Sequence, residues 1–383
     1  MARALYIHWP FCLSKCPYCD FNSHVRDTVD IGHWQRALLA DMAREAEVAG
    51  GEALESVFFG GGTPSLMPPS LVERLLQEAE RLWGFSSGIE ITLEANPSSV
   101  EAGNFAALAA AGVNRVSLGL QAFDDEMLRF FGRLHDAAEG HAALDAAQQN
   151  FARVSFDLIY ARPGQTLDSW RVELKRALSL GTGHLSLYQL TFEPGTRFAT
   201  MLRDGSIDPL GEDACADMFA MTREMTAGLG MPAYEISNHA RPGEESRHNL
   251  AYWRYRDYCG IGPGAHGRRG GAATVRHRKP ENWLAAVGRQ GDGIAEVRDL
   301  GAREQAAEAM LMGLRLTEGV DLEALATRFE LPPAELCDPA KLDFYAGRHL
   351  LWRKGHRIGV TDAGMLLLDA LLGELVPAGL VGA

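Results

Sequence analysis

Six short runs of β-branched and aromatic residues alternate with longer stretches of helical spacing over the first half of the chain. The runs are ALYIHW from Ala4, ESVFFGG from Glu55, IEITLEAN from Ile89, RVSLGLQ from Arg115, RVSFDLIY from Arg153 and HLSLYQL from His184. Helical patterns such as LVERLLQEAERLW, which begins at Leu71, lie between them. Strands that alternate with helices at this spacing form a parallel sheet covered by helices, either a barrel or a doubly wound sheet.

Polar residues and glycines at the ends of these runs favour the barrel. The turn GGGTPS follows the second run, and Glu94, Gln121 and Asp157 stand at or near the ends of the next three runs. The carboxyl ends of barrel strands meet at one mouth, where side chains from different strands form a site. We therefore expect an α/β fold with a partial barrel of six βα units.

The pattern changes after about residue 300. The segments EQAAEAMLMGLRLTEGV, LEALATRF and DAGMLLLDALLGEL have helical spacing, and a short RIGV precedes the last of them. We expect the barrel with its extension over residues 1–300 and a smaller, mainly helical domain of winged-helix type over residues 301–383. Acidic residues outnumber basic ones in this domain, so we interpret it as a packing or partner-docking domain instead of a DNA-binding one.

Composition argues against several classes of protein. The net charge of -13 has the wrong sign for binding a nucleic-acid backbone over a broad surface. No apolar run reaches the roughly 18 residues of a membrane helix, and the first twenty residues lack the apolar stretch of a signal peptide. We expect a cytoplasmic protein with no nucleic-acid partner and no transmembrane segment, which leaves peripheral contact with a membrane open.

Three of the six cysteines stand close together, as Cys12, Cys16 and Cys19. In a reducing compartment such a group indicates metal or redox chemistry. A structural zinc ion needs four ligands, and the fourth would be His8 or His24, since no second CxxC follows. A [4Fe-4S] cluster held by three cysteines would instead leave one iron open. The cysteines that stand alone, which we expect to pack as small apolar residues, are Cys215, Cys259 and Cys337.

The CxxxCxxC spacing resembles that of the radical SAM superfamily, whose enzymes bind S-adenosylmethionine (SAM) at the open iron. The resemblance implies that Cys12, Cys16 and Cys19 hold a [4Fe-4S] cluster, and GGGTPS is similar to the superfamily motif that meets the amino group of SAM. The porphyrin-related branch implies further SAM contacts at the matching positions. The residues implied are Gly61, Gly62, Thr63, Glu94, Gln121, Arg133 and Asp157, with Tyr6 and Tyr18 packed against the adenosine.

The stretch GIGPGAHG, which contains Gly262, Gly264 and Gly267, fits the GxGxxG pattern of dinucleotide sites. The polar segment RRGGAATVRHRKP follows it and does not predict the helix that such a site requires. We therefore expect no nicotinamide site. By resemblance to related barrels, we expect a loop that closes over the cofactor.

The whole chain resembles two related families, the oxygen-independent coproporphyrinogen III oxidases and a family of haem chaperones. The oxidases carry a fourth cysteine two residues after the third, where this chain has Phe21. They also carry an N-terminal extension ahead of their cluster, which we do not expect here because the first cysteine is residue 12. The segment SRHNLAYW contains the HNxxYW motif of the chaperones, whose histidine is implicated in haem binding.

This resemblance implies a haem chaperone that binds the cluster, SAM and haem, and transfers haem to acceptor proteins. His248 of the HNxxYW motif is the expected haem ligand, because a neutral imidazole is a common axial ligand of haem iron. His239 in YEISNHA competes for this role. The alternative is the oxidase, which would decarboxylate coproporphyrinogen III, so whether the chain is an enzyme stays open.

Overall fold

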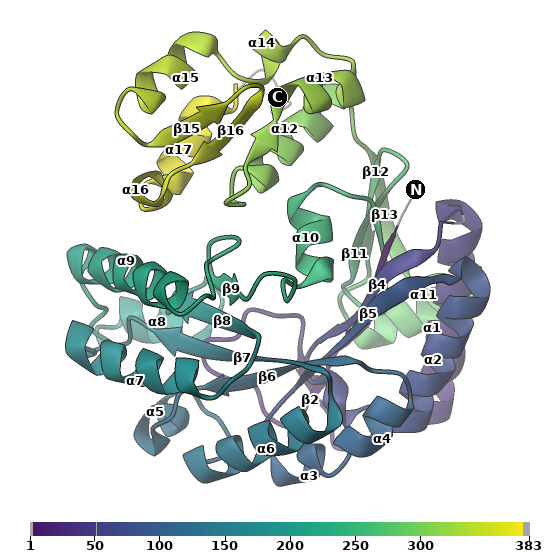
Figure 1. Cartoon of the computed structure of the whole chain (residues 1–383). Helices are drawn as coiled ribbons and strands as arrows, with labels where there is room; N and C mark the ends of the chain where they lie inside the picture. Colours follow the sequence, from purple (N-terminus) through teal and green to yellow (C-terminus); the bar gives the residue numbers. More distant parts are fainter. Residues whose placement is uncertain (1–2, 51, 378–383) are drawn as a thin grey trace.

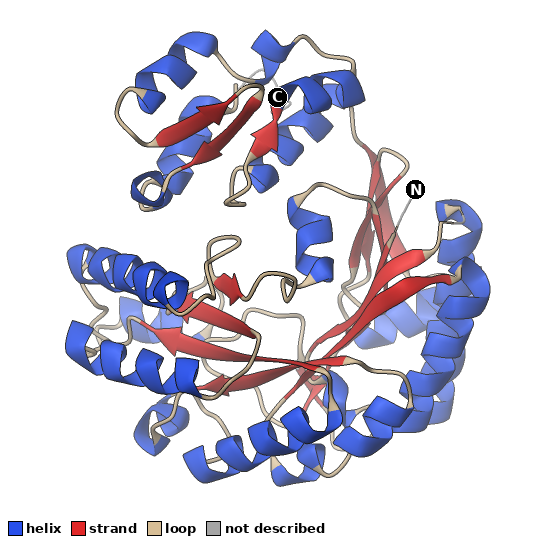
Figure 2. Cartoon of the chain, in the orientation of Figure 1, coloured by secondary structure: helices blue, strands red, loops and turns tan. Residues whose placement is uncertain are grey.

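The computed structural model describes residues 3–50 and 52–377, and its largest element is an 11-stranded sheet (Figure 1 and Figure 2). Six of its strands pair in parallel and in sequence order. They are β1 (Ala4–Trp9), β4 (Leu54–Gly61), β5 (Phe85–Ala95), β6 (Arg115–Gln121), β7 (Arg153–Tyr160) and β8 (His184–Gln189). These are the six predicted strands, and the main difference is that β5 begins at Phe85 instead of Ile89.

The two edges of this parallel unit do not pair with each other, so the barrel stays open. On one side β1 pairs with the parallel strand β10 (Tyr258–Ile261), and on the other β8 pairs with the antiparallel strand β9 (Asn238–Ala240). The sheet continues beyond β10 through β11 (His266–Arg269), β12 (Ala272–Arg276) and β13 (Ile294–Asp299), all antiparallel. The predicted partial barrel of six βα units is confirmed, whereas sequence reasoning did not predict the antiparallel extension.

Helices between the strands cover the outer face of the parallel sheet (Figure 2). They are α1 (Ile31–Ala49), α2 (Pro69–Trp83), α3 (Ser99–Ala102), α4 (Phe105–Ala110), α5 (Asp125–Phe130), α6 (Ala137–Asn150), α7 (Leu167–Ser179), α8 (Arg197–Arg203) and α9 (Glu212–Gly228). In α2, Pro69 occupies the start of the helix, where its missing N–H is tolerated. Leu71, Leu75 and Ala79 then recur at helical spacing and are buried against the sheet.

The chain after β13 forms a separate group of helices and short strands (Figure 1). Its buried apolar residues make a second core. Its helices are α12 (Ala302–Gly313), α13 (Leu322–Phe329), α14 (Pro333–Leu336), α15 (Pro339–Ala346), α16 (Asp362–Met365) and α17 (Leu368–Leu375). They accompany an antiparallel sheet in the order β14 (Val320–Asp321), β16 (Arg357–Val360), β15 (Leu351–Lys354). The smaller, mainly helical C-terminal domain is confirmed, while its exact boundary at residue 301 and its winged-helix type stay predictions.

A buried ion-pair network joins the antiparallel extension to α1. Arg276 of β12 donates from Nε to Asp41 Oδ2 at 2.8 Å and from Nη2 to Glu45 Oε2 at 3.0 Å, and all three side chains have 0% exposed surface. Asp41 Oδ2 also accepts a hydrogen bond from Trp283 Nε1 of α11 (Pro280–Gln290) at 3.2 Å. A buried charge is strongly destabilising unless an opposite charge and hydrogen bonds compensate it. Each member of the network therefore stabilises the buried charges of the others.

Removing one member of this network should be far more costly than removing a surface ion pair. We expect Arg276→Leu to lower the free energy of unfolding by about 3–5 kcal/mol, because buried Asp41 loses its counter-charge and buried Glu45 keeps only Arg269. The matched control is Arg254→Leu, since Arg254 pairs with Glu318 where both side chains are about 40% exposed, at 38% and 41%. That variant should lose about 1 kcal/mol or less. Urea unfolding of both variants measures the difference, and equal losses would contradict the interpretation.

Candidate functional site

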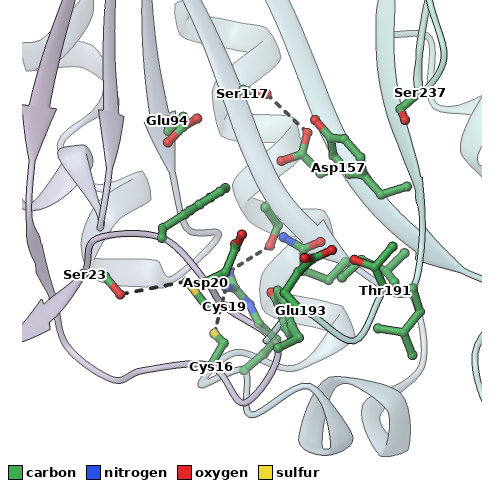
Figure 3. Close-up of a pocket in the computed structure, with 18 of the residues that line it drawn as sticks. Cys16, Cys19, Asp20, Ser23, Glu94, Ser117, Asp157, Thr191, Glu193 and Ser237 are labelled. Carbon is green, nitrogen blue, oxygen red and sulfur yellow. Dashed lines mark hydrogen bonds between the residues drawn. The ribbon is translucent and has the colours of Figure 1, made fainter. Parts of the chain in front are cut away.

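A cavity of about 700 Å³ opens at the carboxyl ends of the parallel strands (Figure 3). Its wall is formed by the cysteine loop, the glycine turn after β4 and the ends of β5 to β8. Predicted site residues on this wall are Cys12, Cys16, Tyr18, Cys19, Gly61, Gly62, Thr63, Glu94, Gln121, Arg133 and Asp157. The fold therefore brings together every predicted site residue except Tyr6 and His248.

The three cysteines lie on the loop from β1 to α1, which contains the short strands β2 (Phe11–Cys12) and β3 (His24–Val25). A polar group lies beside each sulfur. The contacts are Thr63 Oγ1 to Cys12 Sγ at 3.4 Å, Arg133 Nη1 to Cys16 Sγ at 3.6 Å, and Cys19 Sγ to Ser23 Oγ at 3.9 Å. Burial raises the pKa of the Cys12 and Cys19 thiols, so a bound metal centre would have to displace their protons.

The arrangement of these donors fits a cluster better than a single metal ion. Within residues 3–50 and 52–377, no three His, Cys, Asp or Glu side chains lie close enough together to hold one ion. The two histidines considered as a fourth zinc ligand both contact Asn22: His8 Nε2 lies 2.9 Å from its carbonyl oxygen and His24 Nε2 lies 3.3 Å from its Oδ1. A cubane cluster binds each thiolate at a different iron, so its ligands stand further apart than the ligands of one ion.

The glycine turn after β4 ties the cysteine loop to β5. A Cβ atom on Gly62 would stand 2.7 Å from the carbonyl oxygen of Phe11, so only glycine allows this close approach. The backbone N–H of Thr63 donates to the same carbonyl at 2.8 Å. The N–H of Gly61 donates to Glu94 Oε2 at 3.3 Å. The short 3-10 helix η1 (Pro64–Leu66) follows directly.

Two half-buried carboxylates, Glu94 of β5 and Asp157 of β7, point into the cavity (Figure 3). Glu94 pairs in register with Ser117 of β6, and Ser117 Oγ donates to Asp157 Oδ1 at 3.4 Å. Burial, with the neighbouring charge of Asp157 as a second cause, raises the pKa of Glu94 to about 8. Burial likewise raises the pKa of Asp157 to about 6. The pair offers acceptors to ligand hydroxyls, and a cationic ligand bound beside it would favour its ionised form.

Arg133 lies between α5 and α6 and reaches across the cavity wall. Its Nη2 donates to the carbonyl oxygen of Gly119 at 2.9 Å and also to Asn96 Oδ1. Its Nε is buried and has no hydrogen-bond partner among the described residues. A buried N–H without a partner is unfavourable, so this atom fits an acceptor supplied by a ligand, such as a carboxylate. Gln121 at the end of β6 has a φ of 68°, a conformation that non-glycine residues adopt mainly at constrained sites.

Sequence reasoning missed a large part of the cavity wall, including the polar residues Asn96, Tyr188 and Asp369. Asn96 comes directly after β5 in TLEANP, and its Nδ2 donates to Thr63 Oγ1 at 3.1 Å. A polar side chain just after a predicted strand was the signal that could have indicated it. Tyr188 of β8 is 41% exposed, and it lies on the cavity wall beside Asp157. Asp369 comes from α17, which makes the C-terminal domain part of the wall, and nothing in its surrounding sequence indicated this.

Tyr6 and His248 lie away from the cavity wall, inside the barrel. Tyr6 Oη is 3.0 Å from His8 Nδ1. His248 belongs to α10 (Arg247–Trp253), and it is 2% exposed. Its Nδ1 lies 3.1 Å from Ser56 Oγ, its Nε2 lies 2.9 Å from Tyr252 Oη, and burial lowers its pKa to about 3. Both ring nitrogens are therefore engaged within the protein.

The competing histidine and the second glycine motif also lie outside the cavity wall. His239 is 1% exposed and its Nδ1 lies 2.8 Å from Thr226 Oγ1. The loop GIGPGAHG connects β10 to β11 and contacts the cysteine loop, since Asn22 Nδ2 lies 2.9 Å from the carbonyl oxygen of Pro263. None of its residues lines the cavity, so this arrangement does not meet the expectation of a loop that closes over the cofactor.

Comparisons with known proteins identify the family of this chain. Residues 6–177 match the radical SAM superfamily, and residues 300–367 match the HemN C-terminal domain. "Heme chaperone HemW" of Escherichia coli is 36% identical over 96% of this chain and 97% of its own length. The mouse mitochondrial "Radical S-adenosyl methionine domain-containing protein 1" is 37% identical over 98% of this chain and 87% of its own length.

The chain belongs to the HemW family of radical SAM proteins. Membership of the superfamily implies a [4Fe-4S] cluster and SAM. The solved structure of the coproporphyrinogen III oxidase HemN from E. coli matches the fold with a TM-score of 0.82 over 97% of this chain and 89% of that one. Its identity of 24% extends the likeness to the fold alone.

The raised pKa of Glu94 predicts a pH-dependent stability of the cofactor-free protein. In the unfolded chain Glu94 ionises near its ordinary value of 4.5, whereas in the folded chain it ionises near 8. Stability is therefore lost as the pH rises through this interval, and Glu94→Gln should remove the loss. We expect the substitution to increase the free energy of unfolding more at pH 8 than at pH 5, as measured by urea unfolding.

Glu90 provides a control of opposite sign. Burial acts to raise the pKa of Glu90, but the charges of Arg115 and Arg153 outweigh it, and the net shift is downward. Its ionised form therefore stabilises the fold above its ordinary pKa, and this stabilisation is lost as the pH falls. Glu90→Gln should destabilise the protein at pH 7. The assignment fails if the two variants respond to pH in the same direction.

Proposed function

We propose that this chain is a haem chaperone that binds a [4Fe-4S] cluster, SAM and haem, and delivers haem to acceptor proteins. The observation that carries the proposal is the near full-length match to "Heme chaperone HemW" of E. coli, at 36% identity. Phe21 supports it, because it occupies the position at which the related oxidases have their fourth cysteine.

In this proposal the cavity is the cofactor site. Cys12, Cys16 and Cys19 hold the cluster, which supplies a redox-active iron with one open position. Gly61, Gly62 and Thr63 present backbone groups to the amino acid part of SAM, and the free Nε of Arg133 meets its carboxylate. Glu94 and Asp157 accept from the ribose hydroxyls, while Gln121 and Tyr18 complete the wall. Tyr6 does not line the cavity, and it would act indirectly by contacting His8, which contacts the cysteine loop at Asn22.

We further propose His248 as the haem ligand, in a conformation that differs from the buried one of the structure. Its low pKa keeps the imidazole neutral, as iron ligation requires. Both ring nitrogens have partners within the barrel, so ligation requires α10 to leave its place. The helix is only seven residues long, and Glu90 holds its first turn by accepting from the N–H groups of Arg247 and His248, each at 3.1 Å.

The proposed chaperone is a cytoplasmic protein that meets haem acceptors through its C-terminal domain. In the described ranges no helix is both long and apolar enough to cross a membrane. All six cysteines are free thiols, which supports a reducing compartment such as the cytoplasm. Residues 1–300 would carry the cofactors and haem, and residues 301–383 would dock haem acceptors.

An anaerobic haem titration tests this proposal. We expect wild-type protein to bind haem with a Soret band typical of histidine ligation. His248→Ala should shift or abolish that band, because the iron loses its protein donor. His239→Ala is the matched control, since it removes a second fully buried, hydrogen-bonded histidine, and it should leave the band unchanged. Circular dichroism would verify that both variants remain folded.

Two outcomes would contradict the proposal. If His239→Ala, and not His248→Ala, loses the band, the ligand is assigned to the wrong histidine. If wild-type protein converts coproporphyrinogen III efficiently and binds no haem specifically, the chain is an oxidase.

A further inference from the structure

Asn22 lies three positions after Cys19 and joins the cysteine loop to the antiparallel extension of the sheet. Its Nδ2 donates to two carbonyl oxygens, those of Pro263 and Arg278, both at 2.9 Å. Pro263 lies between β10 and β11, and Arg278 lies between β12 and α11. One side-chain amide therefore connects the cysteine loop with two separate segments more than 240 positions away in the sequence.

The backbone carbonyl of Asn22 is held by His8 of β1. His8 Nε2 lies 2.9 Å from the Asn22 carbonyl oxygen, and because a carbonyl can only accept, Nε2 carries the proton. The other ring nitrogen, Nδ1, then accepts from the hydroxyl of Tyr6 at 3.0 Å. A chain of hydrogen bonds thus runs from Tyr6 through His8 and Asn22 to the extension.

The segment that receives Asn22 is itself held in place. A Cβ atom on Gly264 would stand 2.4 Å from Asn22 Nδ2, so the glycine leaves the space that the amide fills. Gly264 also has a φ of 79°, which favours glycine. The N–H of Gly262 donates to Asp41 Oδ2 at 3.0 Å, and Asp41 is the carboxylate that Arg276 pairs with in the buried network. The GIGPGAHG motif is thereby connected to the buried network.

We propose that Asn22 is a positioning residue for the cysteine loop, and that GIGPGAHG is the support against which it holds Cys19. This inference rests on the proposed function, because positioning Cys19 affects function only if the three cysteines hold a cluster. Apart from β2 and β3, of two residues each, the loop has no regular secondary structure, so a few side-chain bonds determine where its cysteines stand. Groups that orient metal ligands from behind typically contribute ten- to one-hundredfold to metal affinity.

The substitution Asn22→Asp tests this role with almost no change of shape. It replaces the Nδ2 donor by a carboxylate oxygen that faces two carbonyl oxygens. Asn114→Asp is the matched control, because Asn114 Nδ2 donates to the carbonyl of Ile89 at 2.8 Å and its Oδ1 accepts from the N–H of Ile91 at 2.9 Å, beside β5 and away from the cysteines. Both variants lose a side-chain bridge between backbone segments.

We expect the two variants to separate in anaerobically reconstituted protein. Asn22→Asp should lose iron to a ferrous chelator about ten- to one-hundredfold faster than wild type and change the electron paramagnetic resonance line shape of the reduced cluster. Asn114→Asp should keep both wild-type properties, even if its resistance to urea falls equally. Gly264→Ala places a methyl group against Asn22 without replacing it, and it should also lose iron faster than wild type. This variant replaces Asn22→Asp in the test if Asn22→Asp does not fold.

Hydrogen exchange in cluster-free protein tests the positioning without the cluster. Asn22→Asp should increase exchange across residues 11–25 at least tenfold relative to Asn114→Asp, because the loop loses its attachment. Wild-type exchange and wild-type iron loss in Asn22→Asp would overturn the inference. A wild-type protein that takes up no cluster would overturn the proposed function instead, while the exchange measurement would still decide the role of Asn22.

Discussion

The parallel pairing of β1 and β4 to β8 is the constraint on which the site depends. Parallel strands place their carboxyl ends at one edge, and the register sets which side chains meet there. It aligns Glu94 with Ser117, and β7 then brings Asp157 within 3.4 Å of Ser117. A shift of one residue in β5 or β7 would turn either carboxylate toward the apolar layer under the helices. The strand register therefore determines the chemistry of the cavity.

Local patterns in the sequence were enough to predict the barrel. Alternating strands and helices predicted the parallel βα units, and the polar residues at strand ends favoured a barrel over a doubly wound sheet. The residues predicted on the cavity wall came mainly from the resemblance to the radical SAM superfamily. These patterns did not predict β10 to β13, because RRGGAATVRHRKP is polar and the buried partners of Arg276 lie on α1, more than 230 positions away. Asp369 was missed for a similar reason: its place in the wall comes from how the C-terminal domain packs against the barrel, which no local pattern encodes.

The two histidine motifs show why a motif and its geometry must be considered together. HNLAYW resembles the motif from which His248 is proposed as a haem ligand, yet in the structure His248 contacts Tyr252, Ser56 of β4 and Glu90 of β5. If His248 is the haem ligand, the proposed haem site and the cavity lie toward opposite ends of the parallel strands. Haem binding would then require a rearrangement around α10, whereas the cavity is already formed in the structure.

We propose that the cysteine loop holds a cluster with an open iron next to a SAM site formed by the strand ends. Electron paramagnetic resonance of the reduced, reconstituted protein, recorded with and without SAM, measures whether SAM reaches that iron. SAM should change the spectrum of the wild type and also that of Cys215→Ala, whose thiol lies outside the loop and contacts the carbonyl of Leu210. An identical spectrum with and without SAM in the wild type would show that no SAM site adjoins the cluster.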